Sequence, residues 1–164
     1  MTIPDNFTKA LIEIVTSLEG QGISWAVTGS MGFALQGIPV TPNDIDIQSD
    51  TQGAYEIEQI LCDCISRSVT PKTTEHMRSV LGRLEIEGVE VEIIGGVQKR
   101  QSDGSWESPV DIEDHKLFLE YQGLQVPVLD LHHEQKAYLK LGRLEKAALL
   151  ADWLAKKGNA KNVN

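Results

Sequence analysis

The chain has little positive charge, few cysteines and no long apolar run, and each shortage excludes a class of protein. Its 164 residues include 15 Lys and Arg against 24 Asp and Glu, which gives a formal net charge of −9. Nucleic acids are bound chiefly by Lys and Arg that neutralise phosphates, so this charge disfavours a general coating of DNA or RNA. A nucleotide ligand remains compatible with it, because divalent cations bridge acidic side chains and phosphates.

Cysteine usage and hydropathy predict a cytoplasmic protein. Cys62 and Cys64 lie in a segment of helical pattern, where side chains at i and i+2 point apart. We interpret them as reduced thiols rather than as a disulfide or a metal pair. No stretch approaches the roughly 20 apolar residues of a membrane span, and the first residues lack the basic start and apolar core of an export signal.

The apolar pattern predicts one α/β (α+β) domain with a mixed β-sheet flanked by helices. We expect helices over residues 7–18, 30–36 and 51–65, strands over 23–27 and 44–48, hairpins over 77–97 and 115–129, and further helices from residue 131. Pro127 is expected to place its strand at a sheet edge. Residues 1–130 are predicted to form the core, and residues 131–164 a C-terminal helical segment packed on the same domain. The polar stretch 98–114 is long enough for a functional loop.

Gly29 and Ser30 directly follow a predicted strand. A glycine at a strand-to-helix turn lacks the Cβ that would block a ligand, and the N–H groups of the following helix favour an anion. The hydroxyl of Ser30 adds a hydrogen-bond donor. This pattern predicts a turn that holds a nucleotide triphosphate.

Asp44 and Asp46 lie two residues apart on the next predicted strand, so their side chains share one face. Two adjacent carboxylates repel each other unless a cation lies between them. Hard oxygen ligands suit Mg²⁺ or Mn²⁺ better than zinc. The pair therefore predicts a metal site of the kind that serves phosphoryl or nucleotidyl displacement.

A third acid is expected from the strand that contains Glu90 and Glu92, which share a face. We favour Glu92 because it lies deeper in the apolar run, whereas Glu90 is close to the predicted turn. Glu92 could bind a metal and accept the proton of an acceptor hydroxyl. The alternative is an exposed residue of an acidic hairpin.

These residues resemble the signature of the nucleotidyltransferase superfamily of DNA polymerase β type. The match consists of Val27-Thr28-Gly29-Ser30, Asp44-Ile45-Asp46 and Glu92. The chain is most similar to the small prokaryotic branch of aminoglycoside and lincosamide nucleotidyltransferases and the minimal nucleotidyltransferases of toxin–antitoxin operons. The resemblance implies the nucleotidyltransferase fold and a Mg²⁺-dependent enzyme that moves a nucleoside monophosphate from an NTP to a hydroxyl of a small-molecule or macromolecular acceptor, releasing pyrophosphate.

Three basic residues are candidates for nucleotide binding. Arg78 lies on the strand facing the acids, where it could offset phosphate charge or pair with a cross-strand glutamate. Arg143 and Lys146 lie in the C-terminal part of the chain, where relatives have basic residues near the nucleotide; the alternative is a solvated pair.

Several features depart from the family pattern or carry weaker signals. No arginine precedes the Asp-x-Asp motif, and Ala147 stands where relatives often have Asp. A binding or regulatory module of the same fold, such as a toxin–antitoxin component, is therefore the alternative function. We interpret His132-His133-Glu134 as residues of a helix start rather than a zinc site. Trp106 could stack on an acceptor, although an aromatic that pins the loop is the default.

Overall fold

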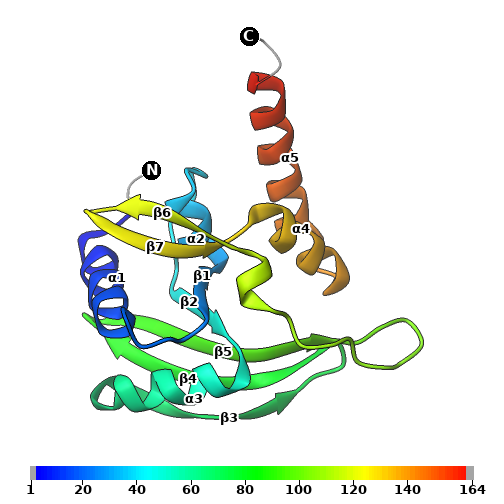
Figure 1. Cartoon of the computed structure of the whole chain (residues 1–164). Helices are drawn as coiled ribbons and strands as arrows, with labels where there is room; N and C mark the ends of the chain where they lie inside the picture. The colour runs from blue at the N-terminus through cyan, green and yellow to red at the C-terminus, as the bar shows by residue number, and fades with distance from the viewer. Residues whose placement is uncertain (1–2, 162–164) are drawn as a thin grey trace.

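A seven-stranded mixed sheet forms the centre of the protein, in the strand order β3-β4-β5-β2-β1-β7-β6. The computed structural model describes residues 3–161 (Figure 1). The strands are β1 (Trp25–Thr28), β2 (Ile45–Ser49), β3 (Ile65–Thr73), β4 (Met77–Ile86), β5 (Val89–Lys99), β6 (Lys116–Tyr121) and β7 (Leu124–Leu129). The helices are α1 (Asp5–Leu18), α2 (Gly29–Leu35), α3 (Thr51–Ile60), α4 (Leu131–Lys140) and α5 (Leu144–Lys161), with short 3-10 helices η1 (Cys62–Cys64) and η2 (Ile112–Asp114).

The central strands bury one face in the main core. Strands β2 and β5 pair in parallel, and β1 lies antiparallel to β2. Ile45 and Ile47 of β2 and Ile93 of β5 are fully buried, together with Leu11 of α1 and Ile57 of α3. Because side chains alternate along a strand, this packing turns the intervening polar residues of β2 and β5 to the opposite face.

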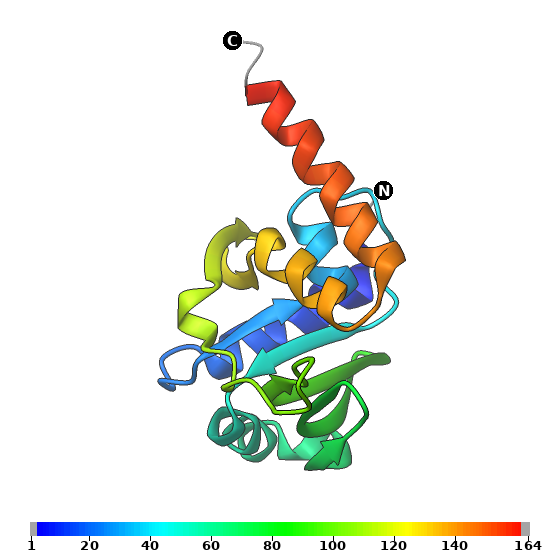
Figure 2. The same ribbon diagram turned by 90° about the vertical axis from the view of Figure 1, so that its right-hand side faces the viewer.

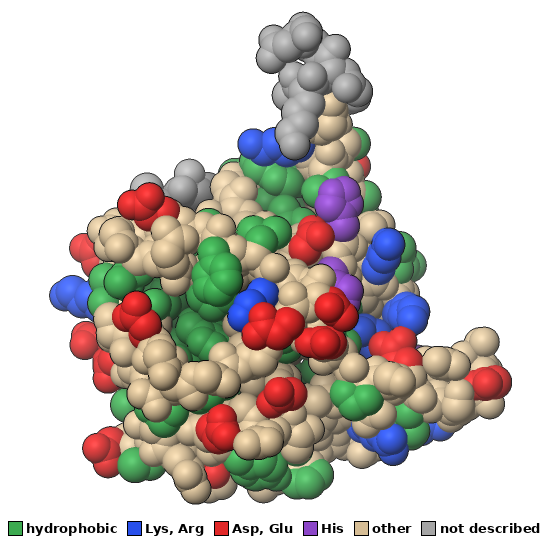
Figure 3. All heavy atoms as spheres, in the orientation of Figure 1, with side chains coloured by type: hydrophobic (Ala, Val, Ile, Leu, Met, Phe, Trp, Pro, Cys, Tyr) green, Lys and Arg blue, Asp and Glu red, His purple; other side chains and the backbone are tan. Residues whose placement is uncertain are grey.

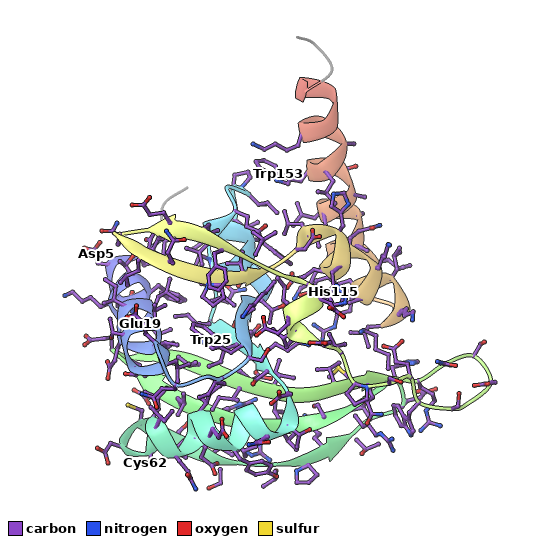
Figure 4. All side chains as sticks on the ribbon, in the orientation of Figure 1. Asp5, Glu19, Trp25, Cys62, His115 and Trp153 are labelled. Atoms are coloured by element: carbon purple, nitrogen blue, oxygen red, sulfur yellow. The ribbon has the colours of Figure 1, made fainter. Side chains whose placement is uncertain are left out.

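A second, smaller core fixes α4 and α5 beside the sheet. Phe33, Ile38, Leu131 and Leu150 form it from α2, the loop after it, α4 and α5. Trp153 packs on its margin (Figure 4), and beyond this point α5 projects from the body (Figure 2). No helix among residues 3–161 is both long and apolar enough to cross a membrane. The second core therefore holds the start of α5 near the polar face of the sheet.

Two expectations about the elements were wrong. The helix predicted to reach Ile65 ends at Ile60, and Ile65 instead begins β3. Val69 is the one buried residue of this edge strand, so β3 lacks the apolar alternation that identifies a strand. Pro127 is not at a sheet edge, because β7 lies between β1 and β6. It is tolerated there since β1 and β7 share a single register pair, Val27 with Val128.

The two cysteines lie in a short 3-10 helix. Cys62 and Cys64 are the ends of η1, and both are free thiols. The mixed sheet with flanking helices is confirmed, including the hairpins β4–β5 and β6–β7.

Candidate active site

Three carboxylates converge on the polar face of β2 and β5. Asp46 lies opposite Glu92 in the parallel register and opposite Thr28 in the antiparallel register, and Asp44 immediately precedes β2. One oxygen atom from each of Asp44, Asp46 and Glu92 lies within 4.8 Å of the others. The sheet thus brings together the three acids that the sequence singled out. Glu90 instead pairs with Arg83, at 3.3 Å between Nε and Oε1.

Burial, together with neighbouring carboxylates, destabilises the ionised forms of the three acids. Burial, followed by the charges of Asp44 and Glu92, raises the pKa of Asp46 to about 7. Burial also raises the pKa of Asp44, with a contribution from Glu90, and burial raises that of Glu92. A divalent cation would favour all three ionised carboxylates. Their hard oxygen atoms fit Mg²⁺ or Mn²⁺.

The turn at Gly29 admits no side chain. Its φ of 67° favours glycine, and a Cβ at this position would lie 2.6 Å from Oδ2 of Asp46. Ser30 follows, and its Oγ accepts a hydrogen bond of 3.3 Å from the Asn43 N–H. This bond ties the turn to the segment that leads into Asp44, so the turn and the acids are positioned together.

Glu134 is a buried acid behind this turn that the sequence did not identify as functional. It is 3% exposed, and its Oε1 accepts hydrogen bonds from the Thr28 hydroxyl and from the Gly29 N–H, the latter at 3.3 Å. Its Oε2 is buried without a partner among the described residues. Burial raises the pKa of Glu134 to about 8, although both hydrogen bonds act to lower it. The group is therefore mainly protonated at neutral pH.

A sequence signal for Glu134 was present. Leu131 and Glu134 are the buried residues of α4, and they lie three residues apart, on one face of the helix. An acid in the apolar stripe of an amphipathic helix needs a partner in the core.

Asp130 caps the helix, accepting a 2.9 Å hydrogen bond from the His132 N–H. Glu134 is in the first turn of α4, as the interpretation of a helix start required.

Arg143 and Lys146 line the cleft that contains the three acids, whereas Arg78 does not. The charges of Arg143 and Lys146 act to lower the pKa of Asp46. The guanidinium of Arg78 lies 5.0 Å from the ring centroid of Trp106, and its Nε donates a 2.8 Å hydrogen bond to Gln98. These contacts hold Arg78 outside the cleft and Trp106 against the body of the protein.

The cleft has a volume of about 410 Å³ and lies between the polar face of the sheet and the helices α4 and α5. Its walls include the turn at Gly29 and Ser30, the three acids, Glu134 and the two basic residues of the α5 region. Anionic and cationic groups therefore face each other across one space.

Comparison with known proteins agrees with this geometry. Residues 10–152 match the model of the aminoglycoside-2″-adenylyltransferases. The chain belongs to this family. The predicted membership of the nucleotidyltransferase superfamily is thereby confirmed, and the protein is an enzyme of the nucleotidyltransferase type. No curated protein matches the chain.

Solved structures support the family fold. A candidate nucleotidyltransferase from Thermotoga maritima is 47% identical, with a TM-score of 0.84 over 94% of this chain and 96% of that one. The lincosamide antibiotic adenylyltransferase LnuA, bound to lincomycin, is 15% identical, with a TM-score of 0.53 over 92% of this chain and 98% of that one. ANT(2″)-Ia, in complex with adenylyl-2″-tobramycin, is 14% identical, with a TM-score of 0.51 over 93% and 94%. The last two likenesses show the fold alone.

Proposed function

We propose that the protein transfers a nucleoside monophosphate from a Mg²⁺-bound NTP to a hydroxyl group of a small-molecule acceptor and releases pyrophosphate. The observation that carries this proposal is the convergence of Asp44, Asp46 and Glu92 within 4.8 Å beside the turn at Gly29. Membership of an adenylyltransferase family supports nucleotidyl transfer in general.

The reaction exchanges one phosphorus–oxygen bond for another. The acceptor oxygen forms a bond to the α-phosphorus, the bond from this phosphorus to the bridging oxygen breaks, and the electron pair leaves with pyrophosphate. Glu92 lies beside Asp44 and Asp46 and accepts the hydroxyl proton as the general base. Divalent cations held by the three carboxylates would neutralise the phosphates and the developing charge.

The remaining residues of the cleft bind and orient the triphosphate. The absence of a side chain at Gly29 lets the Asp46 carboxylate lie against the turn, and the Ser30 hydroxyl can donate a hydrogen bond to a phosphate. Arg143 and Lys146 supply positive charge from the opposite wall. Glu134 supports the turn through Thr28 and Gly29, and as a neutral acid it does so without repelling the nucleotide.

A labelled-nucleotide assay tests the proposal. The full chain is incubated with each α-labelled NTP, Mg²⁺ or Mn²⁺, and a panel of hydroxyl-bearing acceptors. We expect transfer of label that depends on the metal and is absent from the Asp46→Asn variant. Calorimetry with a non-hydrolysable NTP analogue measures binding independently of the acceptor. A folded protein that binds no NTP in the presence of Mg²⁺ refutes the proposal.

A binding or regulatory module of the same fold is the alternative. The three converging carboxylates support the enzyme, since a module that only masks a partner does not need a cluster that destabilises its own charges.

We place the reaction in the cytoplasm, where NTPs are supplied and where thiols such as Cys62 and Cys64 stay reduced.

A further inference from the structure

Strand β5 contains an extra residue near its end. Val80 pairs with Gly95 and Arg78 with Gln98, so three steps along β5 oppose two along β4. Gly96 lies within this β-bulge and has a φ of 62°, the left-handed conformation of a bulge glycine. The bulge changes which side chains of β5 point to each face of the sheet.

Lys99 faces the cleft because of this bulge. Glu92 and Ile94 line the cleft by simple alternation, and Val97 and Lys99 line it beyond the bulge. A regular strand would present residues 96 and 98 to the cleft and turn Lys99 to the other face. Bulges commonly re-aim a side chain next to an active site. Lys99 is thus directed into the same space as the catalytic acids by a specific backbone feature.

The ammonium group of Lys99 is buried with an incomplete counter-charge. Lys99 is 5% exposed, and its Nζ lies 3.3 Å from Oε1 of Glu107. The other oxygen of Glu107 binds the Nζ of Lys140 at 2.8 Å. One carboxylate therefore serves two ammonium groups and leaves positive charge on this wall. A buried charge is costly unless it is fully paired, so this wall favours an anionic ligand.

A second hollow opens from the cleft at this wall. It has a volume of about 470 Å³ and shares Lys99, His133 and Ala137 with the cleft. A hollow of this size suits a small molecule, since ligand pockets measure about 300–1,000 Å³. His115 lies between the sheet and α4 (Figure 4) and stacks on His133, with 3.8 Å between ring centroids.

His133 makes this part of the wall polar without adding a charge. Burial, followed by the charges of His115 and Lys99, lowers the pKa of His133 to about 4. Its imidazole is therefore neutral at physiological pH and can exchange hydrogen bonds with hydroxyl groups.

The carboxylates of the hollow are poorly placed to bind a polycation. Glu107 is already paired with two lysines. Asp111 and Asp114 are exposed, and Oδ1 of Asp111 accepts a 3.0 Å hydrogen bond from the Glu113 N–H. Water and salt screen these exposed acids and also the exposed ammonium group of Lys140, so the buried Lys99 is the main charge of this wall. Figure 3 shows Lys and Arg side chains beside the histidines, with Asp and Glu side chains among them.

We propose that this second hollow binds the acceptor and that the acceptor carries an anionic group, a phosphate ester or a carboxylate, which pairs with Lys99 and Lys140. The inference rests on the proposed transfer reaction. The anionic group fixes the acceptor and does not react; a hydroxyl of the same molecule attacks the α-phosphorus and transfers its proton to Glu92. The acceptor would differ in charge from an aminoglycoside, which is a polycation.

Binding to the nucleotide-loaded protein tests the charge of the acceptor. The full chain is saturated with Mg²⁺ and a non-hydrolysable ATP analogue, then titrated calorimetrically with glucose 6-phosphate, glucuronate, glucose and tobramycin. We expect at least one anionic sugar to bind about tenfold or more tightly than glucose, because a charge-assisted contact is gained. Tobramycin should bind no better than glucose. The two anionic sugars distinguish a phosphate from a carboxylate requirement.

Variants assign the preference to the proposed wall. Lys99→Met and Lys140→Met should each reduce the preference for the anionic sugar, after thermal unfolding has confirmed that the variant is folded. Lys156→Met removes an exposed lysine of α5 and should retain the preference. Equal binding of glucose and both anionic sugars, tighter binding of tobramycin, or a preference that persists in Lys99→Met would each overturn the inference.

The inference and the proposed function fail in different ways. If neither the ATP analogue nor the analogue of any other NTP binds, the proposed function is wrong. If the ATP analogue binds, and α-labelled ATP labels only neutral or polycationic small molecules, the function stands and the anionic acceptor is refuted. Label on RNA alone would likewise overturn the small-molecule acceptor.

Discussion

Strands β2 and β5 present two different surfaces from one backbone. On one face, Ile47 and Ile93 are completely buried against α1 and α3. On the other, Asp46 and Glu92 occupy neighbouring positions with raised pKa values. Apolar burial stabilises the fold, whereas crowded carboxylates oppose it. The buried residues one position along each strand therefore supply the rigidity that holds the crowded carboxylates in place.

The largest effect is expected where the polar face loses a metal ligand. Asp44→Asn and Asp46→Asn should each lower the transfer rate by on the order of 10³-fold, since electrostatic stabilisation is removed. The melting temperature of Asp46→Asn should not fall, because the raised pKa shows that the ionised carboxylate is unfavourable in the fold. Initial rates and thermal unfolding measure the two effects. Retained turnover would refute the metal-binding role.

The opposite result is expected from the buried face. Ile47→Ala creates a cavity at a fully buried position and should lower the free energy of unfolding by about 2–5 kcal/mol. Urea denaturation measures this change, with Asp46→Asn as the matched variant one residue away. If both variants lose equal stability, the buried face does not stabilise the fold more than the polar face does.

A third pair of variants separates the two glutamates of β5. Glu92→Gln should lower the transfer rate by about 10²-fold or more, because the general base is lost. Glu90→Gln removes only a partly exposed ion pair with Arg83 and should change the rate by less than about threefold. Steady-state kinetics under identical metal concentrations make the comparison. A larger effect at Glu90 would show that Glu92 is not the base.

The smallest effect concerns the pH dependence of stability at Glu134. Its pKa is raised from 4.5 to about 8 in the fold, so its contribution is fully present below pH 4.5 and is lost as the pH rises through about 8. Glu134→Gln stays neutral and can still accept the hydrogen bonds from Thr28 and Gly29. The variant should therefore lose a few degrees less in melting temperature than the wild type between about pH 5 and 9.

A control separates this titration from packing. Glu134→Ala removes the hydrogen-bond acceptor and should raise the KM for the NTP, whereas Glu134→Gln should leave it close to the wild-type value. If the melting temperatures of the wild type and of Glu134→Gln change in parallel with pH, Glu134 is not protonated in the folded protein.

Local rules were sufficient to predict the central part of the site. Period-two alternation placed Asp44 and Asp46 on one face, Glu92 was preferred to Glu90 because it lies deeper in the apolar run, and the structure brings Asp44, Asp46 and Glu92 together. The strand-to-turn pattern likewise located Gly29. Each of these inferences depends on residues that are close in sequence.

Long-range contacts account for what the sequence did not reveal. The buried stripe of α4 marks Glu134 as a buried acid, but Glu134 lies 106 residues from Thr28, from whose hydroxyl it accepts a hydrogen bond, so no local pattern connects the acid with the turn. Arg78 was expected near the nucleotide, but its guanidinium packs on Trp106 from the loop after β5. The edge strand β3 gave no apolar alternation because one residue, Val69, is buried in it.

The bulge in β5 divides a single strand into two independent stretches. The side chains before the bulge keep their orientation independently of the residues after it. The single inserted residue determines the orientation of the side chains after the bulge. On our proposals, Glu92 determines how the reaction proceeds and Lys99 determines which molecules enter it. Natural variation could therefore alter acceptor choice within the last few residues of β5 while the chemistry upstream remained unchanged, and an engineer could exchange that short segment to redirect the enzyme.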